Sequence, residues 1–511
     1  MSELSGLPIG WSLVLLKEVT TNIVSVDPTC TPTLAITYFD IGSIDSSVGV
    51  ASAPKLIVGG VAPSRARQRV QEGDVLFSTV RPYLRAIARV PRNTSNGVAS
   101  TGFCVLRGED GVSSGYLFYL ARSESFIKAL EPLQRGTSYP AVRDGDVLGQ
   151  YLPLAPSAEQ RRIVEKLEEL LSDLDAGVAE LRTAQAKLKV YRQSLLKAAF
   201  NGELTSEWRK RRCTTGGSLP ESGIDRLRRI LKARNARWDS LQSARVEKLG
   251  KAPAKVVQAK FPEPVKPIDE QPSLPTDWTW THLGQCFRVE VGATPSRKEP
   301  AYWDGDVPWV SSGEVQFSQI SKTRESITAE GLLNSSTRIN PRGSVMLGMI
   351  GEGKTRGQVA VLDIEAANNQ NCAAVWVSET DIPSMFVYFW LWSRYDETRR
   401  GSSGNNQPAL NKTLVELIPM PLPPVDECDL IAELVSYAFD KATEQELSID
   451  LVLRKSEAQR QNILKAAFSG QLVPQDPNDE PASVLLERIL ASRAENPRKP
   501  SRRSSRMKEP A

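Results

Sequence analysis

LLKAAFNGEL occupies residues 195–204, and a near copy, ILKAAFSGQL, occupies residues 463–472. From Leu195 to Ile463 the separation is 268 residues, a little over half of the 511-residue chain. A coincidence over ten positions is improbable, so we interpret the chain as an internal duplication. The repeat is far longer than the roughly 20–50 residues of a solenoid unit. Each copy must therefore be a whole domain with its helix.

The duplication extends beyond these two decapeptides. Three further patterns recur in the same order: Leu-Pro-x-x-Trp at residues 7–11 and 274–278, Pro-Leu-x-Pro at 153–156 and 421–424, and Arg-Ile-Leu at 229–231 and 488–490. Each copy thus begins with the Leu-Pro-x-x-Trp motif and continues through a strand-rich domain and a long helix to its decapeptide. Two copies on one chain suit a partner with two similar halves, of which duplex DNA is the commonest. A duplicated scaffold without a symmetric ligand is the alternative.

Composition limits the class of protein. A chain of this length predicts two to four domains, and 40% hydrophobic with 24% charged residues is ordinary for a soluble protein. No apolar run approaches the roughly 20 residues of a membrane span, and the N-terminus lacks a signal pattern, so we expect no membrane association and no secretion. The six cysteines are scattered without a Cys-x-x-Cys pair, which fits reduced thiols in the cytoplasm.

Charge and histidine content narrow the chemistry. His282 is the only histidine, which argues against a zinc site and against catalysis by a Ser-His or Cys-His pair. The net charge is +4, but residues 203–260 and 498–506 are rich in Lys and Arg. Such stretches can follow a phosphate backbone, although solvated linkers are an equally good interpretation of each one alone.

Two long helices are predicted, one in each copy. Residues 157–200 contain no proline and only Gly177, and leucine recurs at every seventh position from Leu167 to Leu195. This heptad pattern is typical of a coiled coil, and 44 helical residues make a rod roughly 65 Å long. The pattern is weaker over residues 426–468. Because the chain returns after each globular domain, we expect the two helices to pair antiparallel within one molecule, with an intermolecular parallel zipper as the alternative.

The remaining sequence predicts two strand-rich domains, because runs of Val, Ile and aromatic residues alternate there with turn signals. The expected fold class is α+β with an internal pseudo-two-fold duplication. The predicted segments are residues 1–153, a first strand-rich domain; 154–204, the first long helix; 205–273, a basic helical and Pro-rich linker; 274–421, a second strand-rich domain; 422–472, the second long helix; and 473–511, a C-terminal helix with a basic tail.

One motif resembles a nucleotide-binding loop. Residues 348–355 satisfy the phosphate-loop pattern G-x-x-x-x-G-K-[ST], but such a loop must open a helix. Residues 357–363 read instead as a strand, and residues 79–85 of the first copy keep none of the motif. We therefore predict a hairpin tip. The enzymatic alternative, a nucleotide site built on Lys354 and Asp363, leaves no room for the crossover helix.

Several motifs occur together in an order that is typical of one protein family. They are Gly-Ala-Thr-Pro-Ser at residues 292–296, Tyr-Trp-Asp-Gly-Asp-Val-Pro-Trp at 302–309, Gly-Asp-Val-Leu at 73–76, Pro-Leu-Ala-Pro at 153–156 leading to Glu-Gln at 159–160, and both decapeptides. In this combination the chain resembles, over essentially its full length, the specificity subunit of type I restriction–modification systems. The first copy lacks the Gly-x-Thr-Pro-Ser and Tyr-Trp-x-Gly stretches. The second copy has Val425-Asp426-Glu427 where the family usually has Glu-Gln.

The resemblance implies two target recognition domains separated by an antiparallel coiled coil. Each domain would read one half of an interrupted site in double-stranded DNA, and the helices would set the spacing, about one DNA turn or ~34 Å. The chain itself would catalyse no reaction and hold no cofactor or metal. It would recruit two methyltransferase subunits and two ATP-driven restriction subunits, and S-adenosylmethionine, ATP and Mg²⁺ are expected in those partners. A protein-binding assembly scaffold is the alternative.

Candidate DNA-reading residues are polar side chains on expected loops at corresponding places in the two copies. In the first copy they are Arg81, Tyr83, Arg85, Arg135, Thr137, Ser138, Tyr139 and Arg143. In the second copy they are Lys354, Arg356, Gln358, Asn369, Gln370, Ser403, Asn405, Asn406 and Gln407. Arg and Lys suit guanine, whereas Asn and Gln suit adenine. Alternatively, some of them position phosphates or close turns.

The two decapeptides are candidates for methyltransferase docking, because a surface kept alike in two copies suggests one shared partner. The residues of interest are Lys197, Phe200, Gly202, Lys465, Phe468 and Gly470. The alternative is that Leu195, Phe200, Leu464 and Phe468 pack the ends of the coiled coil.

Overall fold

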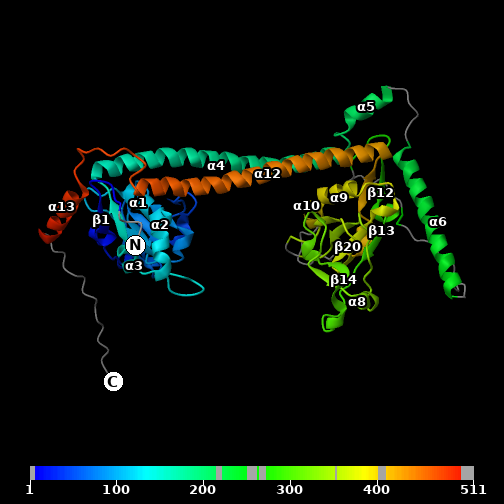
Figure 1. The fold of residues 1–511 in the computed structure, drawn as a ribbon, viewed down its shortest axis with the longest axis horizontal. Helices are drawn as coiled ribbons and strands as arrows, with labels where there is room; N and C mark the ends of the chain where they lie inside the picture. Colours follow the sequence, from blue (N-terminus) through cyan, green and yellow to red (C-terminus); the bar gives the residue numbers. More distant parts are fainter. Residues whose placement is uncertain are drawn as a thin grey trace, which may run out of the picture. The chain divides into compact units, whose positions relative to one another are not determined.

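The computed structural model describes residues 6–214, 221–249, 262–263, 272–351, 354–400 and 410–495 (Figure 1). The chain forms two compact units: the first unit is Met1–Arg182 with Asp450–Ala511, and the second unit is Thr183–Ile449. The segment limits predicted above divide the chain by sequence. The two compact units do not follow these limits, because each unit contains one strand-rich domain together with parts of both long helices. No helix of the described ranges is long and apolar enough to cross a membrane.

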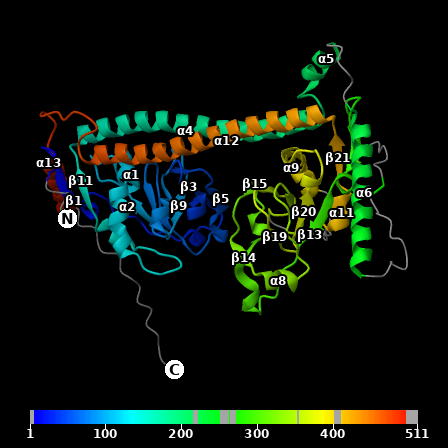
Figure 2. The same cartoon turned by 45° about the vertical axis from the view of Figure 1, so that its right-hand side comes forward.

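The two long helices, α4 (Ser157–Phe200) and α12 (Val425–Phe468), have 44 residues each and run antiparallel, side by side (Figures 1 and 2). In the second unit, Arg192 donates hydrogen bonds to the Glu446 carboxylate at 2.7 Å and to the Thr443 hydroxyl at 2.9 Å. In the first unit, Arg460 on α12 pairs with Asp175 on α4. The prediction of an intramolecular antiparallel coiled coil is confirmed.

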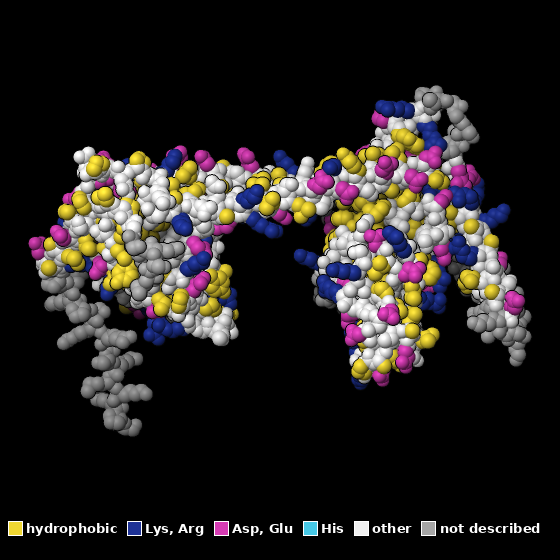
Figure 3. Space-filling view, viewed as in Figure 1, with side chains coloured by type: hydrophobic (Ala, Val, Ile, Leu, Met, Phe, Trp, Pro, Cys, Tyr) yellow, Lys and Arg dark blue, Asp and Glu magenta, His cyan; other side chains and the backbone are white. Residues whose placement is uncertain are grey.

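The heptad pattern marks the contact face of each helix. Every seventh leucine from Leu167 to Leu195 is buried or half-buried, and so are the α12 positions Val435, Ala442 and Ile449. The solvent-facing sides have cationic and acidic side chains interspersed (Figure 3). A narrow apolar seam with charged flanks is what a two-helix coil requires.

Three sheets make up the first strand-rich domain. A two-stranded sheet pairs β1 (Ser12–Leu15) with β11 (Tyr151–Leu154). The five-stranded sheet has the order β10 (Phe103–Leu106), β7 (Val75–Ser78), β8 (Ile87–Arg89), β4 (Val50–Ala51), β3 (Ile44–Asp45), and the four-stranded sheet has the order β5 (Lys55–Val58), β2 (Ala35–Phe39), β9 (Gly97–Ser100), β6 (Ala66–Arg69). The helices of this domain are α1 (Ser114–Arg122), α2 (Glu124–Leu130) and α3 (Asp144–Leu148).

The second strand-rich domain repeats this plan. A two-stranded sheet pairs β12 (Thr279–His282) with β21 (Pro419–Leu422). The five-stranded sheet has the order β13 (Arg288–Val291), β20 (Cys372–Trp376), β17 (Val345–Gly348), β18 (Val359–Leu362), β15 (Ser318–Ile320), and the three-stranded sheet has the order β16 (Glu325–Ile327), β14 (Trp303–Val310), β19 (Ala367–Asn368). Its helices are α7 (Leu283–Cys286), α8 (Ala329–Leu333), α9 (Ser384–Ser393), α10 (Tyr395–Arg400) and α11 (Lys412–Glu416).

Three more helices follow the decapeptides: α5 (Ser206–Thr214), α6 (Gly223–Leu249) and α13 (Ala482–Glu495). Of these, α6 and α13 join the core of the other copy's domain. In the first unit, Leu485 and Ile489 of α13 belong to one buried cluster with Tyr116 and Phe126. In the second unit, Leu227 of α6 is part of the corresponding cluster. Each copy therefore supplies helical segments that complete the domain of the other.

Each decapeptide also packs against the domain of the other copy. Gly202 has φ +82°, and a Cβ atom placed there would collide with Cγ of Pro275 in the second Leu-Pro-x-x-Trp motif. Gly470 has φ +71°, and a Cβ atom there would collide with Cγ of Pro8 in the first motif. The left-handed conformation and the close approach together explain why both decapeptides have glycine here.

Equivalent hydrogen bonds hold each junction. The indole of Trp11 donates to Glu159 at 3.0 Å, and the indole of Trp278 donates to Glu427 at 2.9 Å. Both acceptors lie in the first turn of a long helix, where their charge also suits the helix dipole. The Leu-Pro-x-x-Trp motif is therefore the point at which each domain is attached to the coiled coil.

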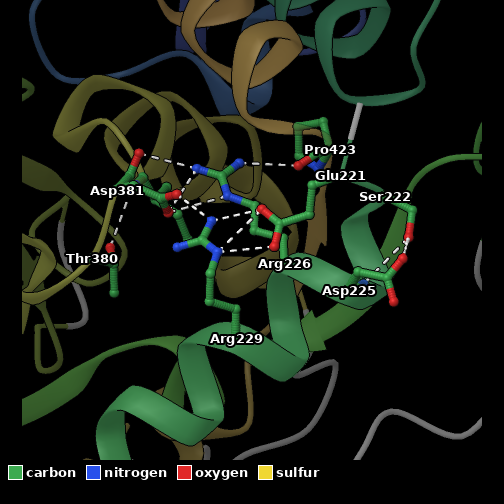
Figure 4. A network of polar contacts seen from close by, with 9 residues as sticks. Glu221, Ser222, Asp225, Arg226, Arg229, Thr380, Asp381 and Pro423 are labelled. Carbon is green, nitrogen blue, oxygen red and sulfur yellow. Dashed lines mark hydrogen bonds and ion pairs between the residues drawn. The ribbon is translucent and has the colours of Figure 1, made fainter. Parts of the chain in front are cut away.

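The helix α6 is attached through a buried arginine (Figure 4). The side chain of Arg226 is fully buried and donates to the Asp381 carboxylate at 3.1 Å and to the Pro423 carbonyl at 3.0 Å. Arg229 pairs with Asp381 at 2.6 Å and with Glu221 at 2.7 Å. Burial raises the pKa of Asp381, but the two arginines outweigh that effect and hold it below its ordinary value.

We expect Gly202→Ala and Gly470→Ala each to lower the free energy of unfolding by about 1–3 kcal/mol, because a left-handed alanine and a new steric overlap both destabilise the junction. Urea denaturation measures the change. The matched control is Gly177→Ala in α4, where a Cβ would meet no atom within 4 Å. That variant should gain about 0.5–1 kcal/mol. Wild-type stability in both junction variants would contradict the packing described here.

Candidate nucleic-acid interface

In the first unit, two connections far apart in sequence lie side by side. One joins β7 to β8, and the other precedes α3. The backbone N–H of Arg81 donates to the Pro140 carbonyl at 2.7 Å, and that of Val142 donates to the Thr79 carbonyl at 2.9 Å. The fold thus brings the candidates at 81–85 and at 135–143 into one loop cluster.

A stacked pair lies at the centre of this cluster. The Arg81 guanidinium lies 4.5 Å from the centre of the Tyr139 ring and donates to the Ser138 carbonyl at 3.1 Å. Tyr139 is 69% exposed, and Tyr83 is also exposed. Arg81 has φ +48°, a left-handed conformation that costs energy for a non-glycine residue. This arrangement presents aromatic and cationic groups to solvent in a fixed orientation.

Two arginines of the cluster are already engaged. Arg85 pairs with Glu124 of α2 and lies 3.8 Å from the carboxylate of Glu457 on α12. These contacts attach the loop to the coiled coil, so the prediction that Arg85 reads a base is not supported. Arg135 pairs with Asp146 at 3.3 Å. The remaining candidates of this cluster, Thr137, Ser138 and Arg143, are exposed.

In the second unit, the phosphate-loop pattern lies between β17 and β18, which pair antiparallel. The backbone N–H of Gly348 donates to the Gln358 carbonyl at 2.9 Å and closes the connection, and the next element among the described residues is the strand β18. The prediction of a hairpin is confirmed. Lys354 is exposed, and its carbonyl accepts a hydrogen bond from the Tyr395 hydroxyl at 2.9 Å. Arg356 and Gln358 are half-buried.

A second connection, residues 369–371, adjoins this hairpin. The Met349 N–H donates to the Asn371 carbonyl at 2.8 Å. Gln370 is exposed, as a base-reading side chain must be. Asn369 is only 7% exposed and its side-chain oxygen accepts the Asn371 N–H at 3.1 Å, so it closes the turn and is not available to DNA. The candidates Ser403, Asn405, Asn406 and Gln407 lie outside the described residues.

The loop of residues 292–298 also lies at this surface. The sequence did not indicate this, and residues 292–296 were used above only as a family motif. Its Ala293 N–H donates to the Asn368 carbonyl at 3.0 Å, and its Thr294 hydroxyl donates to the Gln370 side chain at 2.6 Å. The two segments are about 75 residues apart in sequence. No local pattern signals such a contact.

The decapeptide candidates divide into two groups. Phe200 is buried against Phe386 and Trp390, with ring centres 5.3 and 5.1 Å away, and Phe468 packs edge-on against Tyr116 at 5.2 Å. The packing alternative therefore accounts for both phenylalanines, and Gly202 and Gly470 lie in the junctions described above. The corresponding lysines, Lys197 and Lys465, are exposed.

The fold defines the class of protein: a duplicated protein with two strand-rich domains and two long helices that pair antiparallel. Residues 275–451 match the type I restriction modification DNA specificity domain. The chain is 24% identical to the EcoDI specificity subunit of Escherichia coli over 75% of this chain and 77% of that one.

Two solved structures of type I restriction–modification proteins are similar to this chain. A chain from the type I R-M system, solved to show complex assembly and conformational transition, is 25% identical, with a TM-score of 0.68 over 91% of this chain and 99% of that one. The HsdS subunit from Thermoanaerobacter tengcongensis is also 25% identical, with a TM-score of 0.52 over 92% and 100%. Over most of its length the chain is therefore similar to type I restriction–modification specificity subunits, and residues 275–451 match the DNA specificity domain of that family.

We expect Arg85→Ala to lower the stability of the first unit by about 1 kcal/mol, because Glu124 and Glu457 lose their cationic partner at a partly exposed site. Thermal denaturation measures this loss. Tyr83→Ala is the control: the side chain is exposed on the same connection, and its removal should change stability by less than about 0.5 kcal/mol. Equal stability of the two variants would remove the structural role given to Arg85.

Proposed function

We propose that this chain is the DNA-recognition subunit of a type I restriction–modification complex and that each strand-rich domain reads one half of an interrupted site. The observation that carries this proposal is the pair of polar loop clusters on equivalent hairpins, β7–β8 and β17–β18, of a duplicated fold. The match of residues 275–451 to the DNA specificity domain and the similarity to specificity subunits over most of the chain support it. Base edges in the major groove are read by such projecting side chains.

The two clusters differ in chemistry, so the two half-sites should differ in sequence. The first presents Arg81, Tyr83 and Tyr139. The second presents Lys354, Arg356 and Gln370. Arginine and lysine favour guanine, whereas glutamine favours adenine. The antiparallel coiled coil is the element that fixes the spacing between the half-sites in this proposal, because a helix pair is stiff along its axis.

The chemistry belongs to the partners in this proposal. Two methyltransferase subunits supply S-adenosylmethionine-dependent adenine methylation, and two restriction subunits supply ATP- and Mg²⁺-dependent cleavage. The chain itself is then non-catalytic and acts in the cytoplasm. One methyltransferase docks at each decapeptide through its exposed lysine, Lys197 or Lys465, since the phenylalanines and glycines beside them are used in packing.

We expect Arg356→Ala to relax one position of the second half-site and to leave the first half-site unchanged, because a lost base contact removes discrimination at one base pair, worth about 1–3 kcal/mol. Methylation mapping in cells that express the whole complex measures this. Arg342→Ala is the matched control: it is an exposed arginine before β17 in the same domain. An equal loss of affinity for all sequences would assign Arg356 to a phosphate contact instead.

We expect the double variant Lys197→Glu and Lys465→Glu to stay folded and to co-purify with less methyltransferase, because exposed lysines contribute little to folding. Each single variant should lose about half, as expected for one partner at each of two equivalent surfaces. The control is Lys187→Glu with Lys455→Glu, an exposed pair at equivalent positions of the same two helices. A folded Lys197/Lys465 variant that still recruits two methyltransferases would exclude these lysines from the interface.

A further inference from the structure

The loop of residues 292–298 is partly exposed and is held by several contacts to other segments. The Ala293 N–H is bonded to the Asn368 carbonyl, and a Cβ atom on Gly292 would collide with the same carbonyl. Only glycine permits this approach of two backbones. The loop is therefore held against the turn that carries Gln370.

Two tryptophans hold the loop from its other side. The Trp309 indole donates to the Ala293 carbonyl at 3.1 Å, and the Trp303 indole donates to the Ser296 carbonyl at 3.2 Å. Arg297 lies over the Trp303 ring at 3.7 Å and pairs with Glu325. A cation held by an aromatic face and a carboxylate has little freedom left. The loop is thus a rigid platform.

The turn beneath Gln370 is equally constrained. The buried Asn368 side chain accepts a hydrogen bond from Asn340 at 2.8 Å and donates to the Cys372 carbonyl at 2.8 Å and the Asn369 carbonyl at 2.9 Å. Satisfied buried amides of this kind fix a backbone in one conformation. The exposed Gln370 side chain therefore projects from a backbone that is held in place.

We propose that Thr294 is a positioning residue that presets the Gln370 amide for reading an adenine in the second half-site, an inference that rests on the proposed function. The Thr294 hydroxyl donates to Oε1 of Gln370 at 2.6 Å. This bond uses one lone pair of Oε1 and leaves the other, together with both Nε2 hydrogens, free to bind. Adenine offers the matching acceptor N7 and donor N6 in the major groove. Ordering the amide before binding reduces the entropy lost on binding.

The device belongs to the second domain alone, because the first copy lacks the Gly-x-Thr-Pro-Ser stretch. Its effect must therefore appear in one half-site only. The test is selection of bound sites from a random duplex DNA library by the purified complex of the full chain with its partner subunits. Gln370→Ala should reduce the preference at one position of the second half-site by roughly tenfold or more.

Thr294→Val keeps the side-chain shape but removes the hydroxyl, and it should weaken the preference at that same position by about two- to tenfold. Thr294→Ser keeps the hydroxyl, so it should keep the preference that Thr294→Val weakens. Lys298→Ala, an exposed residue of the same loop, is the control for a general effect of the loop on affinity. Thermal denaturation of each variant establishes that it is folded.

The inference is overturned if folded Thr294→Val retains the full preference, if it weakens all positions equally, or if serine fails to restore what valine removes. It is also overturned if Gln370→Ala relaxes no position while the first half-site is still read. Loss of selection at both half-sites by the unmodified complex would instead reject the proposed function. The two failures are therefore distinguishable.

Discussion

The fold depends on the contact that each decapeptide makes with the Leu-Pro-x-x-Trp motif of the other copy. Gly202 lies against Pro275, and Gly470 lies against Pro8. Because the two contacts are reciprocal, neither copy completes its own domain. The long helices make this possible, because each begins at its own domain and ends at the other, so each core contains residues from both copies.

The junctions keep their geometry while their charges diverge. Each has a tryptophan indole bonded to a glutamate in the first helical turn. Around that shared bond the ion pairs differ: Arg162 of α4 pairs with Asp479 after the second decapeptide, whereas Glu427 of α12 pairs with Arg209 after the first. The cation is on the long helix in the first junction (Arg162) and on the segment after the decapeptide in the second (Arg209). Duplication has thus preserved the hydrogen bond that sets position and changed the charges around it.

The same division applies to the loop clusters. Backbone hydrogen bonds hold both clusters, together with ion pairs in the first and buried amides in the second, and only a few side chains remain exposed. Arg81 and Arg85 illustrate this division. They are four residues apart with the same left-handed conformation, yet one stacks on an exposed tyrosine and the other is paired with acids of α2 and α12. Specificity can change at such exposed positions without loss of the fold, because the supporting contacts come from other residues.

The sequence by itself determined the duplication, the two long helices and the hairpin in place of a phosphate loop. These features are local: heptad spacing, glycine and proline positions, and strand-like runs act through neighbours in the chain. The sequence also identified the loops that carry the candidate site, including Arg81, Tyr139 and Gln370. Only the tertiary structure decided which side chains in those loops are exposed, which copy each decapeptide completes, and that Thr294 contacts Gln370. Such contacts join residues distant in the chain, and their partners are chosen by packing that no local pattern records.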